Sequence, residues 1–336
     1  MTLSSSLLPG SGPSLEELSA RTRSLILESI HHAGAGHIGG PLSATDLLVH
    51  LYFRTLRIDP DRPDWPERDR FILSKGHSSI ALYTVLALRG YFPVEELRTF
   101  DAIDSRLQGH PDMTALPGLD MSTGSLGQGL SPGVGMALAA RLRGLPFRTW
   151  VMLGDGEIQE GQIWEAIFTA ARLELDNLTV ILDANGLPQF GWPAPEGITR
   201  ERPYDDPRAK FEAFGWNVVE CDGHDHDSIA HAFAAATAHR GRPTCIVAQT
   251  IKGKGVSFME AQLAWHASVP TAEQLVEALE EIDQRVRAGE LVGVGGRDRG
   301  LKSPSHGRKS LQTDSGPRRQ EHPQASMASG QEARGG

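Results

Sequence analysis

The chain reads Leu-Gly-Asp-Gly-Glu at residues 153–157 and Val-Ile-Leu-Asp-Ala-Asn at residues 180–185, and these two segments are the clearest indication of its fold. Each segment belongs to the end of a short apolar run that predicts a strand. The residues between them predict a helix, with apolar side chains at helical spacing: Ile158, Ile163, Ile167, Ala170 and Ala171. Thirty residues separate Asp155 from Asn185, the length of one strand–helix–strand unit. The stretch therefore predicts two parallel strands joined by a right-handed crossover.

Both predicted strands lead to residues that suit a metal ion and a phosphate group. Thr149–Leu153 leads to Asp155, and Thr179–Leu182 leads to Asn185. Ligands of parallel sheets bind at the carboxyl ends of the strands, and carboxylate and amide oxygens suit Mg²⁺ or Ca²⁺ together with phosphate oxygens. Gly156 allows a close approach of the backbone to a phosphate, and the amino terminus of the following helix favours an anion. A bare Gly-Asp-Gly also suits an ordinary turn without a metal.

The chain on both sides of this unit alternates helical and strand patterns. Leu15–Ile30 keeps helical spacing, with Ser14 as the expected N-cap and Glu17 three residues later. Further strands are expected at Phe71–Ser74, Asn217–Glu220 and Thr244–Gln249, and further helices at Asp225–His239 and Thr271–Arg287. This alternation predicts an α/β fold, a parallel sheet with helices on both faces.

Composition divides the 336 residues into three parts. Residues 1–13, rich in Ser, Pro and Gly, predict a disordered leader without the basic start of a signal peptide. Residues 14–288 predict the folded domain. Residues 289–336 predict a disordered, mildly basic low-complexity tail, because no aromatic residue follows Trp265 and little apolar surface offsets the entropy of ordering.

Charge and cysteine content exclude several classes of protein. The net charge of −9 at pH 7 gives no footprint for nucleic acid. Only Cys221 and Cys245 occur, and they form neither a disulfide framework nor a zinc motif, so both are expected to be reduced packing residues. No stretch approaches the roughly eighteen apolar residues of a membrane span. The expectation is a cytoplasmic enzyme subunit with no nucleic-acid or membrane partner.

Four histidines form a second group of candidate site residues. His37 follows the first predicted helix, and His77 follows a predicted strand. His110 and His266 lie in Gly-His-Pro and Trp-His-Ala segments. A single histidine of this kind is more often a surface or core residue. Four of them at the ends of elements predict loops that converge on one cleft, where imidazole suits proton movement near neutral pH.

A glycine-rich segment at residues 121–130 completes the pattern. It reads Met-Ser-Thr-Gly-Ser-Leu-Gly-Gln-Gly-Leu, and its glycines allow the backbone to lie flat against a ligand ring, although a flexible surface loop has the same composition. Together with three further stretches, this segment resembles the transketolase family: Gly154–Gly161, Leu175–Leu178 and Lys252–Val256. The resemblance extends over about Leu15–Gln274.

The resemblance implies a thiamine-diphosphate-binding fold that holds thiamine diphosphate and Mg²⁺, with Ca²⁺ or Mn²⁺ as substitutes. The implied metal ligands are Asp155, Asn185 and the backbone carbonyl of Leu187. The implied cofactor contacts are His77, Gly124, Ser125, Leu126, Asp155, Gly156, Glu157, Asn185 and His266. The residues that the resemblance assigns to catalysis are His37 and His110 at the donor hydroxyls, His266 near the diphosphate, and Glu160 at a contact between subunits.

The resemblance covers only the first half of a complete transketolase. It implies the amino-terminal subunit of a split transketolase, which shares its site with a separate carboxyl-terminal, pyrimidine-binding subunit in a heterotetramer. The implied activity is the transfer of a two-carbon ketol unit (glycolaldehyde) from a ketose to an aldose, with sugars or sugar phosphates as substrates. The glutamate that activates the pyrimidine of the cofactor would come from the second subunit.

Departures from the usual sequence of the family leave alternatives open. Pro188 and Phe190 follow Asn185 where the family has other residues, and Ile38 and Pro41 also differ, which bears on the sugar-phosphate substrate. One alternative is another thiamine diphosphate enzyme, similar to deoxyxylulose-phosphate synthase or to a 2-oxo-acid dehydrogenase subunit. The glycine-rich segment and the four histidines argue against it. The other alternative is a non-catalytic scaffold partner.

Overall fold

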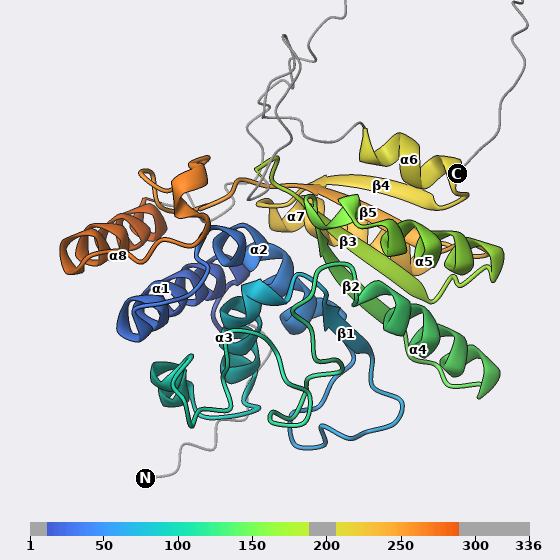
Figure 1. The fold of residues 1–336 in the computed structure, drawn as a ribbon, viewed down its shortest axis with the longest axis horizontal. Coiled ribbons are helices and arrows are strands. Elements are labelled where there is room, and N and C mark those ends of the chain that lie inside the picture. Colours follow the sequence, from blue (N-terminus) through green and yellow to red (C-terminus); the bar gives the residue numbers. More distant parts are fainter. Residues whose placement is uncertain (1–11, 188–205, 289–336) are drawn as a thin grey trace, which may run out of the picture. The chain divides into compact units, whose positions relative to one another are not determined.

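Five strands form the centre of the fold in the computed structural model, which describes residues 12–187 and 206–288 (Figure 1). The strands are β1 (Arg70–Leu73), β2 (Thr149–Gly154), β3 (Leu178–Ala184), β4 (Asn217–Asp222) and β5 (Thr244–Gln249). Their order across the sheet is β1–β2–β3–β5–β4, and all neighbouring strands are parallel. The predicted parallel sheet is therefore confirmed.

The strands are buried on both faces because their side chains alternate between two cores. In β2, Trp150 and Met152 join one core, whereas Val151 and Leu153 join the other. β3 is buried along its whole length. Parallel strands that are covered on both faces carry continuous apolar runs. This explains why the apolar runs that precede Asp155 and Asn185 are clear strand signals in the sequence.

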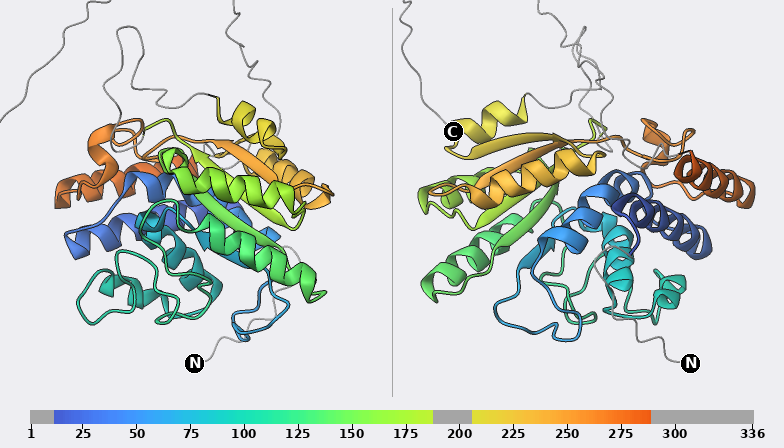
Figure 2. Two further views of the ribbon diagram at one scale, coloured as in Figure 1. Left: turned by 45° about the vertical axis from the view of Figure 1, so that its right-hand side comes forward. Right: turned by 180° about the vertical axis from the view of Figure 1, so that it is seen from behind.

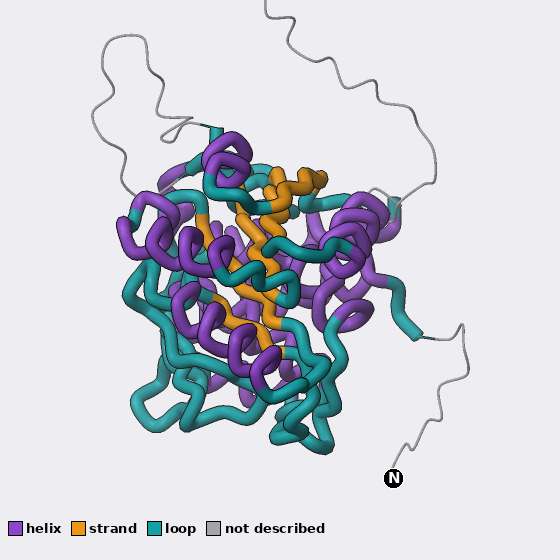
Figure 3. The backbone as a smooth tube through the Cα atoms, turned by 90° about the vertical axis from the view of Figure 1, so that its right-hand side faces the viewer, coloured by secondary structure: helices purple, strands orange, loops and turns teal. Residues whose placement is uncertain are grey.

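The helices form two layers, one on each face of the sheet (Figures 2 and 3). One layer consists of α4 (Leu130–Leu142), α5 (Gly161–Arg172) and α6 (Pro207–Ala213). The other consists of α1 (Leu15–Ala33), α2 (Gly39–His50), α3 (Ser79–Arg89) and α7 (His226–Ala238), with α8 (Ala272–Arg287) packed against α1. Because β4 lies outside β5, the connection from β4 to β5 runs opposite to that from β2 to β3. A right-handed crossover then places α7 on the face opposite α5.

Short helical turns connect these elements: η1 (Leu51–Thr55, a π turn) and the 3₁₀ turns η2 (Gly76–Ser78), η3 (Val94–Thr99), η4 (Glu157–Gln159) and η5 (Leu263–His266). The helical stretch expected to include Ile158 is divided, because α5 begins only at Gly161 after the separate turn η4. The break lies at Glu160, whose backbone is extended (φ −69°, ψ 128°) between the turn and the helix. The predicted capping box of Ser14 with the glutamate three residues later is confirmed.

Several expectations concern residues outside the described ranges. They are the leader up to residue 11, the tail at 289–336, and the departures at Pro188 and Phe190. Over the ranges that are described, none of the helices is both long and apolar enough to cross a membrane. Both cysteines are buried and free, as expected.

Candidate active site

One cavity lies at the carboxyl edge of the sheet, where β1, β2 and β3 end, and it encloses about 240 Å³. Its wall combines these strand ends with the start of α2, the glycine-rich segment at residues 121–130 (the glycine-rich loop) and the segment after β5. The lining residues are His37, Gly40, Lys75, His77, His110, Gly124, Leu126, Gly154, Asp155, Gly156, Glu157, Asn185, Leu187, Lys252 and His266. All but two of the predicted site residues are therefore brought together.

The carboxyl ends of β2 and β3 meet at this cavity. Asp155 follows β2, and its Oδ2 accepts a hydrogen bond at 2.5 Å from the amide of Gly186, which follows Asn185 at the end of β3. Its Oδ1 accepts a hydrogen bond from the Gly156 amide at 2.7 Å. The predicted juxtaposition of Asp155 and Asn185 is confirmed, and its cause is the parallel register of β2 and β3.

Burial shapes the chemistry of Asp155, of which only 3% is exposed. Burial and the nearby Asp183 carboxylate raise the pKa of Asp155 to about 6. Two amide donors and the Lys75 cation act in the opposite direction. A cation bound beside Asp155 would lower this raised pKa and favour the charged carboxylate.

A buried ion pair beside Asp155 did not emerge from the sequence. Asp183 on β3 pairs with Lys75, and both side chains are almost fully buried. Asp183 also accepts hydrogen bonds from the hydroxyls of Ser43, at 2.6 Å, and Thr250. Burial alone would raise the pKa of Asp183, but Lys75 and these donors hold it below its usual range. The two partners are 108 residues apart in the chain, so no local pattern reveals the pair.

Lys252, in the segment after β5, is a second cation of the cavity, and it belongs to the Lys252–Val256 stretch that has no role assigned to it from the sequence. Its ammonium group donates a hydrogen bond to the Leu187 carbonyl at 2.6 Å and lies 2.5 Å from His266 Nδ1. Its side chain passes over Gly39, where an added Cβ would lie 2.8 Å from Lys252 Cγ. Burial lowers the pKa of Lys252 to about 8. The signal that could identify it is the Lys-Gly-Lys-Gly segment at 252–255.

Three of the four predicted histidines cluster on one wall. The ring centroid of His37 lies 5.0 Å from that of His77 and 5.2 Å from that of His266. Burial lowers the pKa of His77 to about 2 and that of His266 to about 3, and it also lowers the pKa of His37. Neighbouring cations act in the same direction. The three rings are therefore neutral near pH 7, and each has one donating and one accepting nitrogen.

His110 approaches the cavity beside the glycine-rich loop. An added Cβ on Gly124 would lie 3.2 Å from His110 Cδ2, so the absence of a side chain at Gly124 makes room for the ring. The Tyr83 hydroxyl lies 2.9 Å from the Gln108 carbonyl and 3.1 Å from the His110 carbonyl, and it anchors this segment to α3. The predicted convergence of the four histidines on one cleft is confirmed.

The resemblance assigns Glu157 to the cofactor, but the structure gives its carboxylate other partners. Oε1 accepts hydrogen bonds from Ser74 Oγ at 2.5 Å and from the Gly127 amide at 2.8 Å, and Oε2 accepts one from the Gly154 amide at 3.1 Å. The buried side chain thus joins the ends of β1 and β2 to the glycine-rich loop. Glu157 lines the cavity, but donors of the protein itself engage its carboxylate.

Ser125 and Glu160 do not line the cavity, and both are exposed. Glu160 is the N-cap residue of α5 and makes no capping hydrogen bond through its side chain. Gly127 packs on it, since an added Cβ there would lie 2.8 Å from Glu160 Cβ. An exposed carboxylate beside the glycine-rich loop is accessible to a second chain. The role of Glu160 at a subunit contact stays a prediction.

The donor set of the cavity suits a hard divalent cation together with a diphosphate. The Asp155 carboxylate, the Asn185 amide oxygen and the Leu187 carbonyl come from one rim. Each of these oxygens retains a further lone pair after accepting a hydrogen bond. Lys75 and Lys252 add positive charge for an anion. Among the described residues, no group of three or more His, Cys, Asp or Glu side chains could hold a metal ion. A metal ion in this cavity would therefore need the amide and carbonyl oxygens in addition to the Asp155 carboxylate.

Fold and site together define an α/β domain that offers oxygen ligands, cations and neutral histidines to an anionic cofactor. Residues 15–282 match the family described as transketolase, thiamine diphosphate binding domain. The chain therefore belongs to the transketolase family, as the thiamine diphosphate binding domain.

Individual relatives show which part of a transketolase the chain resembles. It is 46% identical over 262 residues to a subunit of the 6-deoxy-6-sulfo-D-fructose transketolase of Clostridium sp. (strain MSTE9), covering 78% of this chain and 94% of that protein. It is 41% identical over 272 residues to a subunit of the apulose-4-phosphate transketolase of Phocaeicola vulgatus, covering 81% and 95%. The solved transketolase from Leishmania mexicana has a TM-score of 0.74 at 30% identity, covering 81% of this chain and 41% of that chain. The chain thus spans nearly all of the two subunits but less than half of the solved enzyme.

Proposed function

We propose that this chain is the amino-terminal subunit of a split transketolase, which transfers a two-carbon ketol unit from a ketose to an aldose with thiamine diphosphate and Mg²⁺. The observation that carries the proposal is the cavity at the carboxyl edge of the sheet, which joins Asp155 and Asn185 at one rim with two lysines and the clustered histidines. The two subunit relatives match over nearly their whole lengths, which supports the split arrangement.

The rim and the lysines would bind the diphosphate end of the cofactor. Asp155, Asn185 and the Leu187 carbonyl would hold the metal ion, and Lys75 and Lys252 would neutralise the remaining charge. When bound, the cofactor supplies the carbon centre that accepts the ketol unit and the electron sink for the broken carbon–carbon bond.

The histidines and the glycine-rich loop would serve the rest of the reaction. His77 and His266 would lie at the diphosphate, and His37 and His110 would bind donor hydroxyls. Because the His37 ring is neutral, it can accept a hydroxyl proton on one nitrogen while donating from the other. The loop that contains Leu126 would contact the ring system of the cofactor.

A second chain would complete this site. We infer a carboxyl-terminal, pyrimidine-binding subunit that forms a heterotetramer with this chain. Exposed Ser125 and Glu160 beside the cavity leave its outer border accessible, and the relative from Phocaeicola vulgatus is itself named as one subunit of its enzyme. A cytoplasmic location belongs to the same proposal and fits the two free, buried cysteines.

The names of the relatives suggest the class of donor sugar. One relative is named for 6-deoxy-6-sulfo-D-fructose and the other for apulose-4-phosphate. Both are sugars with an anionic sulfonate or phosphate group. We propose a donor of this class for the present chain, and parallel assays of sulfonated, phosphorylated and uncharged ketoses would rank the three.

The test of the metal and cofactor uses the chain purified together with its pyrimidine-binding subunit. Thiamine diphosphate should raise the melting temperature only when Mg²⁺ is present, by a stabilisation of about 2.7 kcal/mol at roughly a hundred times the dissociation constant. Asp155→Ala should remove this shift, whereas Asp104→Ala, at an exposed carboxylate outside the cavity, should retain it. A metal-dependent shift of wild-type size in Asp155→Ala would exclude the metal role.

The test of the split arrangement compares the chain alone with the two-subunit complex. Ketol transfer, and exchange of the reactive thiazolium proton of added cofactor, should appear only in the complex, because the group that activates the pyrimidine lies on the partner. Robust turnover by the chain alone would show that the split arrangement is wrong.

A further inference from the structure

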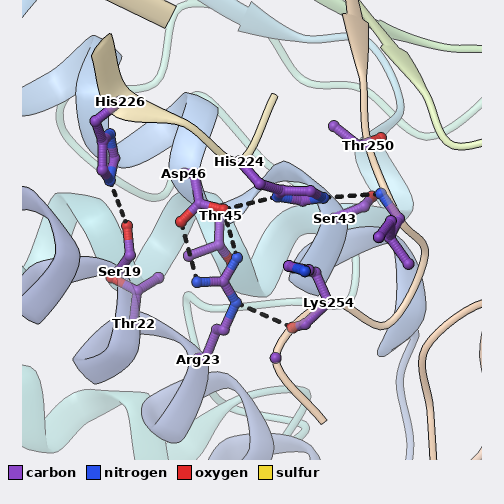
Figure 4. Close-up of polar contacts among 12 residues, drawn as sticks. Ser19, Thr22, Arg23, Ser43, Thr45, Asp46, His224, His226, Thr250 and Lys254 are labelled. Atoms are coloured by element: carbon purple, nitrogen blue, oxygen red, sulfur yellow. Dashed lines mark hydrogen bonds and ion pairs between the residues drawn. The ribbon is translucent and has the colours of Figure 1, made fainter. Parts of the chain in front are cut away.

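A second buried polar cluster lies outside the cavity and has no part in the proposed chemistry (Figure 4). Arg23 of α1 and Asp46 of α2 form a two-pronged ion pair with N–O distances of 3.0 and 2.6 Å. His224, in the turn after β4, lies with Nδ1 2.8 Å from Asp46 Oδ2. Burial alone would raise the pKa of Asp46, but Arg23 and His224 hold it well below its usual range. Asp46 is therefore a fixed, charged acceptor.

The hydrogen bonds of His224 define its tautomer. Its Nε2 lies 2.8 Å from the amide nitrogen of Ile251, and a backbone N–H can only donate. Nε2 must therefore carry the lone pair, and the ring proton lies on Nδ1, where it is donated to Asp46. His224 is a neutral bridge between a carboxylate on one side and a backbone amide on the other.

The accepting nitrogen of His224 holds the backbone directly before Lys252. Figure 4 shows the ring between the α2 carboxylate and this segment. On the other side of Lys252, the Gly253 amide donates to the Gly39 carbonyl at 3.0 Å. The backbone is thus held on both sides of Lys252. The side chain that holds the Ile251 amide comes from the connection between β4 and α7.

We propose that His224 is a positioning residue for cofactor binding, which fixes the segment that directs the Lys252 ammonium group into the cavity. The proposal rests on the proposed function, because Lys252 can bind a diphosphate only if the cavity holds one. The Arg23–Asp46 ion pair orients the ring, and the ring holds the Ile251 amide. The packing of α1 against α2 thereby sets the position of a cavity cation.

Two substitutions separate the two hydrogen bonds of the ring. The amide of asparagine reaches about as far as Nδ1, so His224→Asn retains a donor for Asp46 and loses the acceptor for Ile251. The amide of glutamine reaches about as far as Nε2, so His224→Gln retains the acceptor and loses the donor. Each variant gives up one buried hydrogen bond. A purely structural role therefore predicts similar losses of stability and equal cofactor affinities.

The assay is titration of the two-subunit complex with thiamine diphosphate in the presence of Mg²⁺. His224→Asn should weaken the affinity by at least about fivefold, the lower end of the cost of an unsatisfied buried amide. His224→Gln should stay within about twofold of the wild type, since it keeps that acceptor. In a Lys252→Met background, the loss caused by His224→Asn should disappear, because the two residues act as a coupled pair.

Each outcome decides between the two proposals. Equal losses of cofactor affinity in the two His224 variants would overturn the positioning role and leave the proposed function intact. An undiminished loss of affinity from His224→Asn in the Lys252→Met background would do the same. A wild-type complex that binds no thiamine diphosphate would overturn both. If His224→Asn does not fold, hydrogen–deuterium exchange of the wild-type complex decides. The Ile251 amide should be protected before cofactor is added, and rapid exchange at that stage would overturn the positioning role.

Discussion

Replacement of Glu157 by glutamine should destabilise the fold, although the two side chains have nearly the same shape. The Glu157 carboxylate receives hydrogen bonds from the Ser74 hydroxyl and from the amides of Gly127 and Gly154. A carboxylate is a pure acceptor, whereas a glutamine amide has one accepting oxygen and one donating NH₂ group. Whichever way the amide is turned, its NH₂ group faces at least one backbone N–H.

The magnitude follows from these contacts. One backbone donor left unsatisfied in a buried site costs about 1–3 kcal/mol, and the remaining hydrogen bonds lose their charge assistance. Burial raises the pKa of Glu157, so removal of the charge recovers part of its desolvation cost. The net loss should be about 2 kcal/mol, which lowers the melting temperature of a domain of this size by about 4–8 °C.

The assay is thermal unfolding followed by circular dichroism, with Glu160→Gln as the matched control. Glu160 is an exposed glutamate close by in the same segment, so its substitution should change stability by less than about 0.5 kcal/mol. Cofactor affinity should also fall in Glu157→Gln, because the Gly127 amide belongs to the glycine-rich loop. Equal melting temperatures for the two variants would refute the reasoning from converging donors.

Two further predictions concern histidines. His37→Ala and His110→Ala should retain cofactor binding and lose turnover, because their proposed partners are donor hydroxyls, whereas His77→Ala should weaken cofactor binding as well. Steady-state rates combined with cofactor titration test this, and full turnover in the double variant His37→Ala, His110→Ala would contradict it. The second prediction is that the chain loses stability in mild acid, because burial lowers the pKa of several histidines. Besides the three clustered histidines of the cavity, His50 and His226 contribute: their ring centroids lie 6.0 Å apart, burial lowers the pKa of His50 to about 4, and it also lowers that of His226. As the pH falls, the unfolded chain therefore binds more protons than the folded chain. The free energy of unfolding should have its full value above about pH 6.5 and decline from there towards about pH 4. Urea unfolding at several pH values measures the slope, and a His50→Phe variant with an unchanged slope would argue against this origin.

Most of the fold, and the placement of Asp155 beside Asn185 in the site, follow from the amino-acid sequence. Buried parallel strands require continuous apolar runs, so the strands that precede Asp155 and Asn185 can be predicted from these runs alone. A strand–helix–strand spacing and a right-handed crossover then suffice to place those two residues at one edge. Local capping chemistry likewise determines the start of α1 at Ser14. These features depend on neighbours in the chain or on general rules of connection.

Which side chains pair across the fold depends on how the helices and loops pack. Three contacts join distant parts of the chain: the Lys75–Asp183 ion pair, the hydrogen bonds from Ser74 and Gly127 to Glu157, and the His224 bridge to the amide before Lys252. Each is a hydrogen bond or ion pair whose partner is selected by the packing of helices and loops. The motifs indicate that a cation or a carboxylate is present, but only the distances between packed elements determine whether that group faces a ligand or holds another part of the protein.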